Sequence, residues 1–69
     1  MVTVDQKVRF DAFNGIKDGN ETMSLIVTGT VYAVNYAHKV FHVVYTIGEN
    51  KMRTSFNFCD IGKKVEVVQ

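Results

Sequence analysis

The sequence predicts an all-β fold of about five short strands in one domain, residues 1–69. From Lys7 onward, apolar and polar residues alternate with a period of two, which fits half-buried strands much better than a helix. The apolar runs are also rich in β-branched and aromatic residues, which favour strands. A chain of 69 residues, 46% of them hydrophobic, can bury one core and has no room for a second.

The first strand is expected over residues 7–13, KVRFDAF. Alternation places Val8, Phe10 and Ala12 on one face and Arg9 and Asp11 on the other. Residues 14–24 contain two glycines and two asparagines and show no alternation. This composition predicts a long loop between the first strand and the second.

Residues 25–35, 40–47 and 51–58 are predicted to form a three-strand meander. If GENK is a four-residue loop, the second hairpin pairs almost only apolar residues with one another. The predicted pairs are Ile47 with Met52, Tyr45 with Thr54, Val43 with Phe56, and Phe41 with Phe58.

If NYAHK is the loop of the first hairpin, Val34 faces Val40 and Val31 faces Val43. The same register places Gly29 opposite Tyr45, so the glycine would leave space for the tyrosine ring. The outer face of the meander is then polar and β-branched, as expected of a solvated sheet face. Its members are Thr28, Thr30, Tyr32, His42, Val44, Thr46, Arg53, Ser55 and Asn57.

The end of the chain predicts one tight helical turn, which Asp60 begins and Gly62 ends, and then a last strand over residues 65–68. This order of elements resembles that of an SH3-like small barrel. In that family the first loop corresponds to the RT loop, NYAHK to the n-Src loop, GENK to the distal hairpin and CDIG to the 3-10 turn. The resemblance covers most of the chain and implies a five-stranded SH3-like barrel.

Composition limits the classes of function. The formal net charge is only +1, so the broad positive field of most independent nucleic-acid binders is lacking. A single cysteine, Cys59, allows no internal disulfide, and no zinc-binding spacing of cysteine and histidine is present. The start of the chain does not read as a signal peptide, and no apolar run is long enough to span a membrane. A cytoplasmic location is expected.

The main candidate site is a groove between the first long loop and the NYAHK loop, where SH3-like proteins bind their partners. A partner protein is the expected ligand, because the NYAHK loop carries a tyrosine, a histidine and a lysine. Tyrosine offers a large contact area at low entropic cost. The alternative is that Tyr36 only caps the end of the barrel and that His38 is simply solvated. A proline-rich ligand is not expected, because the chain has neither tryptophan nor proline. The candidate residues are Phe13, Asn14, Ile16, Lys17, Asp18, Tyr36, His38 and Lys39.

A secondary candidate is an outer-face patch of Tyr32, His42 and Arg53, which could bind nucleic acid or a ribonucleoprotein. The segment GTVYAV loosely resembles the core of KOW-type SH3-like barrels from ribosomal and transcription proteins. The alternative is an ordinary polar sheet face.

No catalytic or metal site is predicted, because His38, His42 and Cys59 do not converge in the predicted register. Cys59 is expected to be a small buried hydrophobe. The chain is therefore predicted to be a non-enzymatic binding module without a cofactor, an adaptor or inhibitor similar in size and style to phage accessory proteins. A homo-oligomer with a ligand site between subunits is a further alternative.

Overall fold

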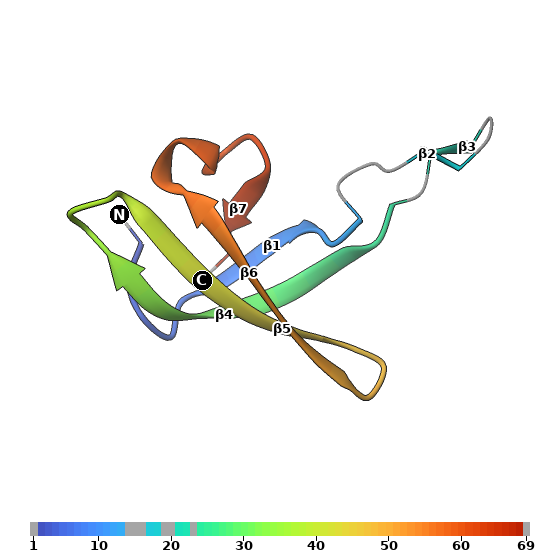
Figure 1. The fold of residues 1–69 in the computed structure, drawn as a ribbon, viewed down its shortest axis with the longest axis horizontal. Helices are drawn as coiled ribbons and strands as arrows, with labels where there is room; N and C mark the ends of the chain where they lie inside the picture. The colour runs from blue at the N-terminus through green and yellow to red at the C-terminus, as the bar shows by residue number, and fades with distance from the viewer. Residues whose placement is uncertain (1, 14–16, 19–20, 23, 69) are drawn as a thin grey trace.

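The computed structural model describes residues 2–13, 17–18, 21–22 and 24–68. Five antiparallel strands form one sheet in the order β6-β5-β4-β1-β7, and the short strands β2 and β3 pair separately (Figure 1). The predicted all-β fold, with a 3-10 turn before the last strand, is confirmed. The elements are β1 (Lys7–Asp11), β2 (Lys17–Asp18), β3 (Glu21–Thr22), β4 (Ile26–Asn35), β5 (Val40–Ile47), β6 (Asn50–Asn57), η1 (Phe58–Asp60) and β7 (Val65–Val67).

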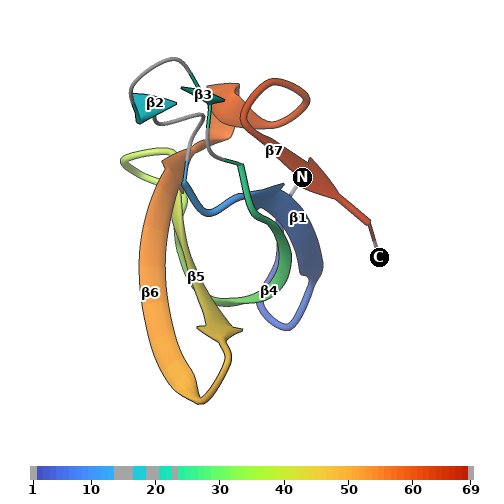
Figure 2. The ribbon, with the colours of Figure 1, turned by 90° about the vertical axis from the view of Figure 1, so that its right-hand side faces the viewer.

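The longest strand, β4, connects the two halves of the sheet. Its first half pairs with β1 from Ile26 to Thr30, and its second half pairs with β5 from Thr30 to Asn35. Figure 2 shows β4 arching between β5 and β6 on one side and β1 on the other. This curvature creates a concave inner face, on which the alternating apolar residues of several strands can meet.

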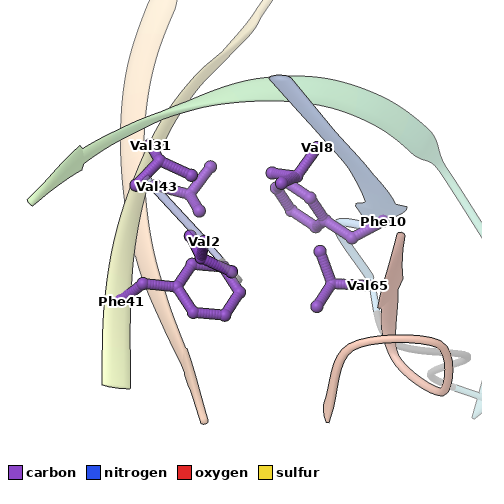
Figure 3. Packing of buried hydrophobic residues seen from close by; sticks show 7 residues of the cluster. All are labelled: Val2, Val8, Phe10, Val31, Phe41, Val43 and Val65. Atoms are coloured by element: carbon purple, nitrogen blue, oxygen red, sulfur yellow. The ribbon is translucent and has the colours of Figure 1, made fainter. Parts of the chain in front are cut away.

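Seven side chains form the buried core on this inner face (Figure 3). They come from β1, β4, β5 and β7 and from the segment before β1, and the Phe41 ring is completely buried. Burying a large apolar side chain contributes about 1.5–3 kcal/mol, so this cluster is the main source of stability in so short a chain. The core residues are Val2, Val8, Phe10, Val31, Phe41, Val43 and Val65.

Val2 is a core residue that the strand pattern did not identify. The segment that carries it is attached to β4 by two backbone hydrogen bonds at Val31. The amide of Asp5 donates to the carbonyl oxygen of Val31 at 2.8 Å. The amide of Val31 in turn donates to the carbonyl oxygen of Gln6 at 2.9 Å. This attachment holds the chain start over the core, where Val2 has no exposed surface.

The predicted register of the second hairpin is wrong by two residues. A two-residue turn of Gly48 and Glu49 closes the hairpin, so Ile47 pairs with Asn50 and Phe41 pairs with Phe56. Gly48 has a φ of +60°, and a positive φ at this position is what a tight two-residue hairpin turn requires. A shift of two leaves every side chain on its predicted face, because the side-chain period of a strand is two.

The first hairpin departs from its prediction at one point. Val31 pairs with Val43 as predicted, but the register then shifts between Val31 and Ala33. Beyond this irregularity Val34 pairs with Phe41 rather than with Val40. A β-bulge, which inserts one extra residue into one strand, produces this kind of shift and bends the strand.

Three local expectations need correction. The 3-10 turn precedes its predicted position, since Asp60 ends η1 rather than beginning the turn. Cys59 lies in η1 and is exposed, not buried. Gly29 is tightly enclosed as expected, but a Cβ there would meet Val43 and Phe10 rather than Tyr45.

Candidate functional site

The outer-face patch predicted from sequence is assembled in the structure. The rings of Tyr32 and His42 lie with centroids 6.0 Å apart, and the Arg53 Cζ atom lies 5.8 Å from the Tyr32 ring centroid. A hydrogen bond of 2.6 Å joins His42 Nδ1 to the Ser55 hydroxyl. These four residues, Tyr32, His42, Arg53 and Ser55, are called the outer-face cluster below.

Strand geometry explains why the cluster forms. Tyr32 lies at the bulge of β4, whereas His42 and Ser55 are direct partners across β5 and β6. Arg53 lies two residues from Ser55 on the same face of β6, which places its long side chain within reach of the Tyr32 ring. Tyr32 keeps 44% of its surface exposed, so a partner can reach its ring.

The predicted register, with Phe41 opposite Phe58, places His42 opposite Asn57 and so does not identify Ser55 as its partner. The error follows from the two-residue register shift of the hairpin, which moves Ser55 into the position opposite His42. The turn sequence IGEN carried a usable signal, because a glycine at the first position suits a two-residue turn.

The surface around the cluster is weakly basic. Strands β4, β5 and β6 contain no aspartate or glutamate, and they contribute Lys51 and Arg53 to the outer face. On the neighbouring strand β1, the Lys7 ammonium donates to the Thr30 hydroxyl at 2.7 Å, and Arg9 forms a 3.0 Å ion pair with Glu66. A group bound over the cluster would therefore meet positive charge without a compensating carboxylate from these three strands.

The residues of the predicted loop site have mixed roles. Tyr36 is half exposed, but its hydroxyl donates to the Val2 carbonyl oxygen at 2.9 Å and its ring contacts Phe58 edge to face. Lys39 is exposed and has a φ of +59°, and its carbonyl oxygen accepts a hydrogen bond from the Phe58 amide. His38 is exposed, and its backbone amide donates to the Asn35 side chain. Tyr36 thus contributes to the packing at this end of the sheet, and half of its surface stays exposed.

Among the described residues, those of the two predicted loops lie at opposite ends of β4. Phe13, half-buried, follows β1 at the end where Asp11 pairs with Ile26, whereas Tyr36 follows the opposite end of β4. Figure 1 shows β2 and β3 on the far side of the molecule from the turn that joins β4 to β5. Lys17 and Asp18 form β2, and Asn14 and Ile16 lie outside the described residues.

Two hollows lie near the base of the first long loop. The larger one, of about 450 Å³, is lined by Ile26 of β4, by the Arg9–Glu66 ion pair and by Lys63 and Lys64. The smaller one, of about 230 Å³, has the aromatic side chains of Phe10, Tyr45 and Phe56 among its lining residues. The rings of Tyr45 and Phe56 each contact the Phe10 ring edge to face, so the three are explained as the margin of the core.

Within the described ranges, no three histidine, cysteine or acidic side chains come together as metal ligands. No helix in that part of the chain is long and apolar enough to cross a membrane.

The chain matches no protein-family model, no curated protein and no solved structure in comparisons with known proteins. The resemblance to SH3-like barrels and the similarity to phage accessory proteins therefore stay predictions.

Proposed function

We propose that the protein is a non-enzymatic binding module that contacts a partner protein through the outer-face cluster. The observation that supports this proposal is the mutual packing of Tyr32, His42 and Arg53 on an open sheet face. Tyrosine and arginine are two of the residue types that most often dominate the energetics of protein interfaces.

The existing contacts lower the cost of binding. Immobilising one flexible side chain at an interface costs about 0.5–1.5 kcal/mol. The Arg53 guanidinium already lies over the Tyr32 ring, and the imidazole of His42 is oriented by its hydrogen bond with Ser55. A partner would meet these side chains in place, so less of the binding energy would be spent on ordering them.

Charge favours a protein over a nucleic acid as the partner. Much of the affinity for nucleic acid comes from neutralising several phosphates with lysine and arginine side chains. The formal net charge of the chain is +1, and β4 to β6 supply only Lys51 and Arg53 to this face. Such a surface suits a limited contact with an acidic group on a protein better than a long phosphate backbone.

Affinity capture from a lysate of the native host tests this function. The tagged wild-type chain and its Arg53→Ala and Tyr32→Ala variants would be compared, each with and without nuclease. Removing a central arginine commonly costs about 2 kcal/mol or more, so capture of the partner should fall at least about tenfold in both variants. Binding should survive nuclease treatment.

Two variants serve as matched controls. Thr28→Ala changes an exposed residue of β4 outside the cluster, and His38→Ala changes an exposed residue of the loop. Both should capture the partner as the wild type does, and all variants should unfold at similar temperatures. If only His38→Ala lost the partner, the binding site would lie on the loop and not on the outer-face cluster. If nuclease abolished capture, the ligand would be a nucleic acid.

A further inference from the structure

We propose that the open edge of β6 accepts an extended acidic segment of the partner protein as an additional strand. This inference rests on the proposed function, because the edge adjoins the outer-face cluster through Arg53 and Ser55. In the described part of the chain β6 is one of the two edge strands of the five-stranded sheet and pairs only with β5. An outermost strand presents backbone donors and acceptors that another chain can use.

The hydrogen-bond pattern identifies the groups that point outward. Successive residues of an antiparallel strand direct their backbone groups alternately toward and away from the paired neighbour. The Phe58 amide donates toward β5, to the Lys39 carbonyl oxygen, while the Asn57 amide donates instead to Asp60 Oδ2. Counting back in steps of two from Asn57, the outward groups belong to Ser55, Arg53 and Lys51.

The Asp60 carboxylate limits the length of this edge. Its 3.0 Å hydrogen bond occupies the Asn57 amide, so an added strand can pair along Lys51 to Ser55 and no further toward η1. At the other end, the turn of Gly48 and Glu49 closes the hairpin. The available edge is therefore about five residues long, which is a common length for a strand.

Side chains on this edge determine the sign of the charge that fits. The residues with outward amides also place their side chains on the outer face, where Lys51 and Arg53 are exposed. A residue directly opposite on an added strand would have its Cβ about 4.5–5.5 Å away, and opposite charges stabilise such pairs. An added strand should therefore carry acidic residues at alternate positions, with apolar or β-branched residues between them to meet Met52 and Thr54.

A second copy of this chain fits the edge less well. If the β6 strands of two copies pair antiparallel with Met52 or Arg53 at the centre, a lysine or arginine of one copy lies opposite an arginine of the other. Like charges directly opposite each other destabilise such a pair. Pairing about Thr54 avoids this conflict, but it uses only Arg53 and Ser55 because the Asn57 amide is already bonded. The opposite edge of the sheet, β7, is only three residues long, and its Glu66 is paired with Arg9.

The experiment uses two synthetic peptides with blocked ends, TEVEVET and its basic counterpart TKVKVKT. Amide–water exchange of the wild-type protein would be measured by NMR with and without each peptide. At a peptide concentration of about ten times its Kd, TEVEVET should slow exchange about tenfold at the amides of Lys51, Arg53 and Ser55. TKVKVKT should leave these rates unchanged.

A pair of variants separates backbone pairing from charge. Lys51→Ala removes the ammonium group but keeps the outward amide, whereas Lys51→Pro removes both, and proline is tolerated on an edge strand at such a position. Peptide affinity should be lowered more by Lys51→Pro than by Lys51→Ala. Equal losses in the two variants would overturn strand addition.

The remaining outcomes also decide between the proposals. If a peptide shifts the NMR signals of Tyr32 and His42 but does not slow amide–water exchange on β6, strand addition is overturned and the proposed function stands. Equal protection by both peptides would overturn the acidic preference. Protection that rises with protein concentration in the absence of peptide, together with the mass of a dimer, would assign the edge to a second copy and overturn the proposal.

Discussion

The Tyr36 hydroxyl donates a hydrogen bond of 2.9 Å to the carbonyl oxygen of Val2. This bond crosses from the turn after β4 to the segment before β1, and the Tyr36 ring also packs edge to face on Phe58 of η1. One side chain thus connects the chain start, the first hairpin and the 3-10 turn. The residue that most resembles a ligand contact on this loop is in fact part of the tertiary structure.

Tyr36→Phe should lower the free energy of unfolding by about 0.5–1.5 kcal/mol, because the ring stays and only the hydrogen bond is lost. Tyr36→Ala should cost more, because it also removes the contact with Phe58. Urea denaturation followed by circular dichroism measures both changes. His38→Ala, at an exposed position on the same turn, should change stability by less than about 0.5 kcal/mol. Equal stability of Tyr36→Phe and wild type would show that the bond to Val2 adds nothing in solution.

Gly29→Ala should destabilise the fold by about 1–3 kcal/mol, as overpacking of a core commonly does. A Cβ at Gly29 would clash with the Val43 side chain and would lie 2.9 Å from the Val44 carbonyl oxygen and 3.3 Å from the Phe10 ring. The backbone oxygen cannot move away without disturbing the pairing of β4 with β5. Thermal unfolding of the purified variant measures the loss.

Gly48→Ala is the matched control, because a Cβ there meets nothing within 4 Å and only the φ of +60° opposes it. Gly48→Asn should be more stable than Gly48→Ala, since asparagine tolerates a positive φ better than alanine. If Gly29→Ala were as stable as the wild type, the close approach of β4 to Val43 would not hold in solution.

Up to the bulge of β4 the faces of the strands could be predicted from the sequence, but their register could not; beyond the bulge, a shift of one residue places Val34 opposite Phe41. Val8, Phe10, Val31, Phe41 and Val43 were all placed on the inner face, because alternation survives any register shift by two. Exact partners depend on how many residues each turn contains, and apolar pairs were available for both a two-residue and a four-residue turn. The hairpin therefore has the predicted faces and different partners.

Two features of the candidate site were beyond sequence reasoning for a similar reason. The bulge at Tyr32 adds one residue to β4, and no glycine or proline at that point marks it. The contact of Arg53 with Tyr32 spans three strands, so it depends on two registers at once. Val2 was missed because one apolar residue ahead of the first strand has no period to reveal it.

Cys59 should react with a thiol reagent in the folded protein, because it is a free cysteine at an exposed position in η1. The second-order rate constant with 5,5′-dithiobis(2-nitrobenzoic acid) should be within about tenfold of the value in denaturant, since access is the main difference between the two states. Cys59→Ser should change stability by less than about 0.5 kcal/mol. A thiol that reacts only after unfolding would restore the buried placement expected from sequence.

Asp60→Ala should lower the free energy of unfolding by about 1 kcal/mol, the typical cost of losing a side-chain cap on a backbone amide. The Asp60 carboxylate accepts the Asn57 amide at 3.0 Å, where β6 passes into η1. The Asp60 carbonyl oxygen accepts the amides of Lys63 and Lys64, and those backbone bonds are unaffected by a change of side chain. The effect should therefore be confined to the junction of β6 with η1.

Amide–water exchange at Asn57 provides the specific measurement for this variant. In Asp60→Ala the Asn57 amide should exchange faster than in the wild type, because its only bonded acceptor among the described residues has been removed. Glu49→Ala removes the same charge from an exposed turn and should leave the Asn57 exchange rate unchanged. Equal exchange in all three proteins would mean that the carboxylate does not hold this amide, and that the edge of β6 extends beyond Ser55.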